Sequence, residues 1–155
     1  MMKKLFVAII ACTSINAFAI SIPITESMVN SRVSESFPKT VKKVELSNPQ
    51  ITLMEGKSIL CLEGIPRIMF LDKAFKSCAS FKPFWNEKES RLEATHLELI
   101  DLTITEVGSV PSVLRILMSE VLIGIEPLVL YKADSWFLKQ VSSIEVTKGM
   151  MYLKY

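Results

Sequence analysis

The sequence predicts an α+β fold in which a curved antiparallel β-sheet wraps around a long apolar helix, with a further helix at the N-terminus. Residues 40–106 contain short segments that alternate between apolar and polar side chains and are joined by tight polar connections. This pattern, without an intervening helix, is typical of an antiparallel meander. Residues 25–36 and 111–125 show the three-to-four spacing of helices, and the second segment is apolar around most of its circumference.

The first 19 residues have the features of an export signal. Lys3 and Lys4 precede the apolar stretch "LFVAIIACTSI", and Ala17-Phe18-Ala19 has the small-x-small form of a signal-peptidase site. The apolar run is shorter than the ~20 residues that a membrane-spanning helix needs. We therefore expect cleavage after Ala19 and release into the periplasm. The alternative is a cut before Cys12, in a lipobox-like sequence, which would anchor the protein in the envelope through a lipid.

Cleavage after residue 19 would leave 136 of the 155 residues, a length that suits one domain over residues 20–155. It would also remove two of the 18 basic residues and no acidic one, so that 16 basic and 16 acidic residues remain. Nucleic-acid binding requires a basic face that displaces counterions from phosphates. The neutral balance therefore argues against a nucleic-acid-binding protein.

Two cysteines, Cys61 and Cys78, would remain in the released form. An oxidising compartment permits a disulfide between them, although their spacing alone does not show that the side chains meet. Such a bond would close a loop of roughly seventeen residues and add about 3 kcal/mol to stability. The alternative is two buried thiols that act as small hydrophobic groups.

The expected first helix begins with a cap and ends at Pro38. Thr25 can cap the helix, Ile24 and Val29 stand at the positions of a hydrophobic staple, and Glu26 places negative charge in the first turn. Near the C-terminus, Lys148-Gly149 predicts a turn between two short strands.

The expected second helix begins near Pro111 and has more apolar surface than one face can hold. Its apolar residues are Val113, Leu114, Ile116, Leu117, Met118, Val121, Leu122, Ile123 and Ile125. A helix that is apolar on nearly all sides is expected to be buried on nearly all sides. Arg115 and Glu120 argue against a membrane span, so we expect the sheet to wrap around this helix.

Catalytic signatures are missing from the sequence. His96 is the sole histidine and stands on an alternating strand, and no glycine-rich phosphate loop, GxSxG or HExxH motif occurs. No Cys/His spacing resembles a metal site. We therefore expect no enzymatic activity, no cofactor and no metal.

Four segments, taken in order, resemble the YceB-like envelope proteins of Gram-negative bacteria. They are "ITESMVNSRVSESFP", "VELSNPQITLMEG", "EPLVLY" and "VSSIEVTKGMMYL". The family is similar in fold to tubular lipid-binding domains, so the resemblance implies binding of a lipid or other hydrophobic ligand in the periplasm. It supplies no catalytic residues. The chain departs from the family in its weak lipobox and in the pair Cys61 and Cys78.

The resemblance and the apolar composition together predict a monomer with an apolar groove for a lipid or hydrophobic small molecule. The candidate ligand-binding residues are Phe75, Phe81, Val113, Leu117, Val121 and Leu122. The alternative function is an interaction module with a filled core and no small-molecule ligand, which would contact another envelope protein or the membrane.

Overall fold

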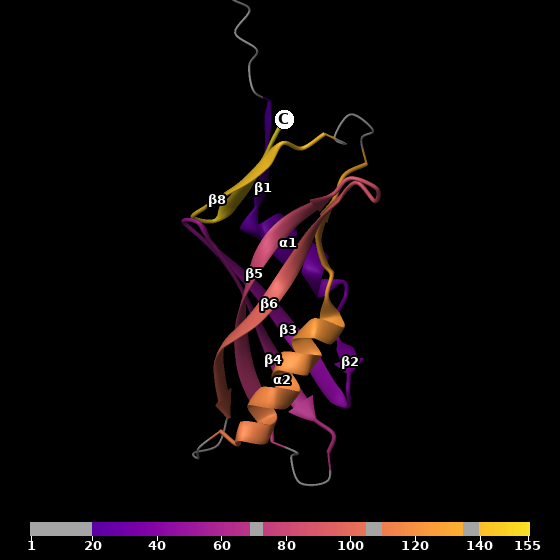
Figure 1. Ribbon diagram of the computed structural model, residues 1–155, viewed down its shortest axis with the longest axis vertical. Coiled ribbons are helices and arrows are strands. Elements are labelled where there is room, and N and C mark those ends of the chain that lie inside the picture. The colour runs from indigo at the N-terminus through magenta and orange to yellow at the C-terminus, as the bar shows by residue number, and fades with distance from the viewer. Residues whose placement is uncertain (1–19, 69–72, 105–109, 135–139) are drawn as a thin grey trace, which may run out of the picture.

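The computed structural model describes residues 20–68, 73–104, 110–134 and 140–155, which form two antiparallel sheets and two helices (Figure 1). The expected export signal and Cys12 lie outside the described residues. Strands hold 58% and helices 19% of the described part, so the fold is mostly β.

Six strands form the larger sheet in their order along the chain, each antiparallel to its neighbours. This arrangement confirms the predicted meander. Alternate side chains of the central strands point into a core that lies between the curled sheet and the helices. The strands are β2 (Lys39–Val41), β3 (Val44–Met54), β4 (Lys57–Pro66), β5 (Phe75–Asn86), β6 (Arg91–Ile104) and β7 (Leu128–Lys132).

The smaller sheet joins the two ends of the described chain in the order β1 (Ser21–Thr25), β9 (Met150–Lys154) and β8 (Ser143–Thr147). Gly149 has a φ of +75° in the turn between β8 and β9, a conformation that glycine adopts without steric cost. The predicted hairpin is therefore confirmed. The same turn binds the larger sheet, because the Gly149 N–H donates to the Leu53 carbonyl at 3.0 Å.

The first helix, α1 (Glu26–Ser34), is capped as predicted, with the Met28 N–H donating to Thr25 Oγ1 at 3.2 Å. β2 pairs only with the first residues of β3. Along the rest of this edge of β3, polar residues of α1 take the place of a neighbouring strand. Asn30 accepts from the Ile51 N–H at 2.6 Å and donates to the Ile51 carbonyl at 2.9 Å. Glu26 accepts from the Leu53 N–H at 2.9 Å. The helix thus completes the hydrogen bonding of the upper edge of β3.

We expect Asn30→Ala to lower the free energy of unfolding by about 2–3 kcal/mol, because it leaves the Ile51 N–H and carbonyl without their partner. The measurement is urea denaturation followed by circular dichroism. Ser31→Ala, at the next and exposed position of α1, is the control and is expected to cost less than about 0.5 kcal/mol. Equal effects of the two changes would contradict the assigned role of Asn30.

The expectation of a sheet wrapped around a long apolar helix is wrong. The second helix, α2 (Ser112–Ile125), has 14 residues and contacts β6 and β2, while α1 contacts β3 and β7. Each helix thus bridges the two halves of the curled sheet. One face of α2 is buried, whereas Val113, Ile116 and Ile123 are exposed. Although α2 is apolar around most of its circumference, it is therefore not buried on all sides.

Three contacts hold α2 against the sheet. Glu126, which caps the helix C-terminus, accepts from the Leu97 N–H of β6 at 2.5 Å. On the other side, a Cβ at Gly124 would lie 2.6 Å from Cγ1 of Val41, so only glycine permits this approach to β2. Together with the ion pair described below, these contacts fix which face of α2 is turned outward.

Candidate interaction surface

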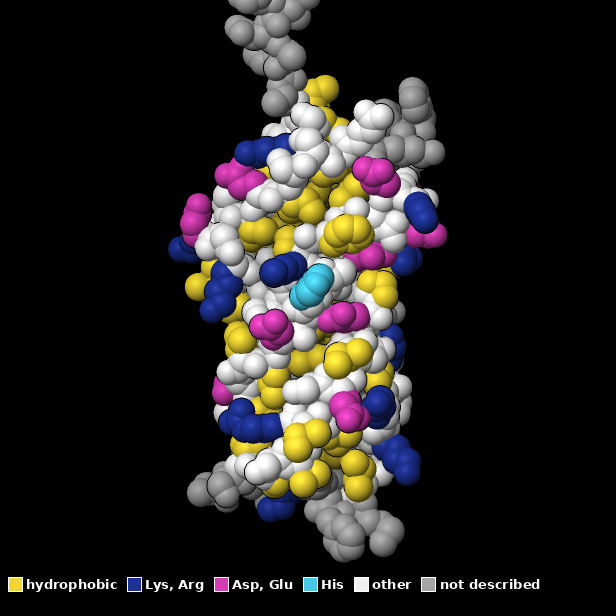
Figure 2. All heavy atoms as spheres, viewed as in Figure 1, with side chains coloured by type: hydrophobic (Ala, Val, Ile, Leu, Met, Phe, Trp, Pro, Cys, Tyr) yellow, Lys and Arg dark blue, Asp and Glu magenta, His cyan; other side chains and the backbone are white. Residues whose placement is uncertain are grey.

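Three large aliphatic side chains are exposed on one face of α2. We define the α2 ridge as Val113, Ile116, Glu120 and Ile123. The three aliphatic side chains are 64%, 64% and 68% exposed. Figure 2 shows hydrophobic side chains gathered over α2 in the lower half of the molecule. Scattered apolar residues are normal on surfaces, whereas apolar side chains that gather in one patch are a common feature of interaction sites.

The opposite face of α2 anchors the helix. Its side chains are at most 2% exposed and belong to the core: Leu114, Met118, Val121, Leu122 and Ile125. Because these five residues already supply the buried face of an amphipathic helix, the fold does not need Val113, Ile116 or Ile123 to be aliphatic. The ridge is therefore a second apolar face without a structural role inside the chain.

One charged group interrupts the ridge. Glu120 stands between Ile116 and Ile123, and its Oε2 lies 3.2 Å from Nζ of Lys42 in the turn between β2 and β3. Both side chains are about half exposed, at 53% and 55%. The pair is thus accessible to a partner that covers the ridge.

The six candidate groove residues fall into different environments. Phe75, Phe81, Val121 and Leu122 belong to the buried core, Leu117 is half-buried against that core, and Val113 is exposed. None of the six lines the two clefts described below or a polar cleft near Asn48 and Glu63. Four of them thus fill the interior, while Val113 belongs to the ridge.

An apolar cleft lies where the two sheets meet. Its volume is about 530 Å³, and its walls are formed by the end of β5 and by β8. Phe84, Trp85 and Ile144 contribute apolar surface. Trp85 is buried, and its indole N–H has no acceptor within the described residues. This cleft is a better candidate for an apolar ligand than the core residues.

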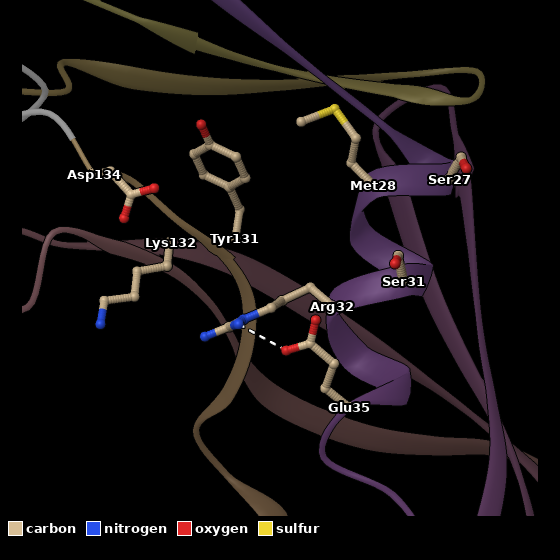
Figure 3. Close-up of a pocket in the computed structure, with 8 residues that line it drawn as sticks. All are labelled: Ser27, Met28, Ser31, Arg32, Glu35, Tyr131, Lys132 and Asp134. Carbon is tan, nitrogen blue, oxygen red and sulfur yellow. Dashed lines mark hydrogen bonds and ion pairs between the residues drawn. The ribbon is translucent and has the colours of Figure 1, made fainter.

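A second cleft, between α1 and β7, is polar and open (Figure 3). Its volume is about 520 Å³, and its charged groups do not converge on one point. Arg32 of α1 pairs at 2.8 Å with Glu35, the C-cap residue of that helix. Lys132 and Asp134 stand on the opposite wall. Nothing in this arrangement pairs a nucleophile with a base.

His96 is exposed and lies at an irregular part of β6, where its φ is +52°. Its Nδ1 is 3.1 Å from Oγ1 of Thr95. No acidic group is near enough to orient the ring through an ion pair among the described residues. The described part of the chain also contains no cluster of three or more His, Cys, Asp or Glu that would hold a metal ion.

Burial of the Tyr155 hydroxyl raises the pKa of this side chain, and the neighbouring Tyr131 raises it further. The hydroxyl finds no hydrogen-bond partner within the described residues. The side chain is half-buried and packs against the core.

Cys61 and Cys78 are at disulfide distance, with 2.04 Å between their sulfur atoms. They are directly opposite each other on β4 and β5. Both are half-buried on the side of the sheet that faces away from the core, between buried neighbours such as Leu60 and Ala79. The antiparallel register of this hairpin is what brings them together.

Reduction of the pair is expected to lower the free energy of unfolding by about 3 kcal/mol, because it releases a closed loop of about seventeen residues. The measurement is chemical denaturation with and without dithiothreitol. A Cys61→Ala, Cys78→Ala variant should show no response to the reductant. A wild-type protein that is equally indifferent would contradict a bond between these cysteines.

The ridge was missed because its signal was assigned to the interior. The sequence shows Ile116 and Ile123 on the side of the helix away from Met118. Nothing in an apolar side chain indicates whether its own chain or a partner covers it.

Neither α1 nor α2 combines the length and hydropathy that a bilayer-spanning helix needs. No protein-family model matches the chain, and no curated protein sequence shows significant similarity to it.

Proposed function

We propose that this protein is a docking module of the cell envelope, which binds another envelope protein through the α2 ridge. The exposure of Val113, Ile116 and Ile123 on one face of a firmly anchored helix carries the proposal. Large exposed apolar patches on a folded protein are typical of sites that bind another macromolecule.

Two further features support a docking role. Phe75, Phe81, Val121 and Leu122 fill the core, which leaves them no role in a groove. Export through residues 1–19 would place the protein among envelope proteins, with release into the periplasm as the expected form. Both export and membership of the YceB-like family are predictions from sequence patterns.

Site-specific photo-cross-linking in cells tests the docking role. A benzophenone amino acid at position 116 should give one dominant protein adduct, whereas the same group at Ser31, on the exposed face of α1, should not. Ile123→Ser should reduce the adduct from position 116 by about tenfold, because it removes a neighbouring apolar contact. The same adducts from positions 116 and 31, or no effect of Ile123→Ser, would overturn the proposal.

A second candidate function is binding of an apolar ligand in the cleft between β5 and β8. The buried Trp85 and the exposed Phe84 beside Ile144 favour it. We expect a fluorescent fatty-acid probe to bind, and Ile144→Asp to weaken binding at least about tenfold by placing a charge in the cleft. Ile100→Asp, at an exposed position of β6, is the control. Equal binding by both variants would exclude this cleft.

A further inference from the structure

The α2 ridge has the residue spacing with which one helix packs along another. Val113, Ile116, Glu120 and Ile123 follow at intervals of three, four and three residues, which is the a/d spacing of a heptad and keeps them on one narrow line. We propose, on the basis of the docking role above, that the partner supplies an amphipathic α-helix that packs along α2 and carries a lysine or arginine opposite Glu120.

The dimensions of α2 suit this packing. Its 14 residues span two heptads, or about 21 Å. A helix that crosses α2 at about 20° would remain in contact over this length, with an axis separation of about 8–10 Å. Val113, Ile116 and Ile123 would then insert between apolar side chains of the partner. An extended strand alternates with a period of two and does not match the spacing of the ridge.

Glu120 determines the charge that the partner must bring. Its Oε2 is paired with Lys42, whereas within the described residues Oε1 has no donor at hydrogen-bond distance. A helix that covers the ridge removes water from this carboxylate, which is costly unless another donor replaces the water. A lysine or arginine facing Glu120 provides that donor and fixes the register of the two helices.

A second copy of this chain is a poorer occupant. In a parallel pair of α2 helices, Glu120 would face Glu120 of the other copy, and like charges would be brought together. In an antiparallel pair centred on the ridge, Glu120 would face Ile116. Both arrangements desolvate two carboxylates, and no other ridge residue carries a donor that could face them, so self-association is disfavoured.

A lipid surface is also a poorer occupant. A flat acyl layer would cover Glu120 together with its apolar neighbours and would offer it no hydrogen-bond donor.

A panel of labelled helical peptides tests the inference with the purified protein. The peptides have leucine at a and d positions over three heptads, with either lysine or glutamate at the central a position that would face Glu120. By fluorescence anisotropy, we expect the lysine peptide to bind at least about tenfold more tightly than the glutamate peptide. Glu120→Lys should reverse this preference, and Glu120→Gln should remove it. Glu35→Lys, a charge reversal at the C-cap of α1, should leave it unchanged.

A peptide of the same composition with alternating apolar residues distinguishes helical packing from nonspecific hydrophobic binding. It should bind at least about tenfold more weakly than the lysine peptide. The inference is overturned if the alternating peptide binds as well, if Glu120→Lys does not change the preference, or if sedimentation shows that the free protein dimerises through the ridge. Photo-cross-linking from position 116 tests the docking role separately. An adduct that depends on Ile123, combined with peptides that are not distinguished, would refute only the helical partner.

Discussion

Met118→Ala is expected to lower the free energy of unfolding by about 2–5 kcal/mol, whereas Ile116→Ala, two residues away on the same helix, should change it by less than about 0.5 kcal/mol. Met118 is fully buried on the inner face of α2, and its truncation leaves a cavity in the core. Ile116 is 64% exposed and fills no space in the isolated protein. Urea denaturation of both variants measures the difference.

This pair of variants separates the observed fold from the one expected from sequence. A sheet wrapped around the helix would bury both side chains, and both truncations would then be costly. Similar losses at positions 116 and 118 would therefore contradict the assignment of the ridge to the protein surface. Circular dichroism of both variants provides the control for helix content.

Gly64→Ala is expected to destabilise the protein by about 1–3 kcal/mol through overpacking. Gly64 on β4 is paired with Phe75 on β5, and the aromatic ring lies across the glycine. A Cβ at this position would overlap Cζ of Phe75, a side chain that is only 1% exposed. The ring would have to move within a filled core.

A double-mutant cycle tests the cause of this loss. Phe75→Leu shortens the side chain that meets the new methyl group, so Gly64→Ala should cost less in the Phe75→Leu background than in the wild-type protein. An unchanged cost, measured by the same denaturation experiment, would show that the effect of Gly64→Ala arises elsewhere.

Local features of this fold were predictable because their causes are local. Thr25 caps α1 and Gly149 forms the hairpin turn, since each depends on the conformation of a few neighbouring residues. The meander over β2–β6 was predictable because the alternation of side chains directly reports one buried face. The boundaries of α2 were also close to those expected.

The position of α2 was not predictable in the same way. Its two apolar faces have the same chemistry, and only the tertiary structure shows that Met118 meets the core while Ile116 and Ile123 meet solvent. The approach of Cys61 to Cys78 likewise depends on the register of β4 and β5, which spacing along the chain does not determine. Contacts such as those of Asn30 with Ile51 link distant segments and have no signal in composition or periodicity.

The central claim is that the α2 ridge is exposed in the isolated protein and covered by a partner in the cell envelope. Ser119→Cys tests it most directly, because this exposed position lies beside the ridge and leaves its four residues intact. Ser31→Cys, exposed on α1, is the matched control. We expect maleimide to label both cysteines at similar rates in the purified protein, and to label position 119 at least about tenfold more slowly than position 31 in intact envelopes. Equal labelling rates at both positions in intact envelopes would contradict the claim.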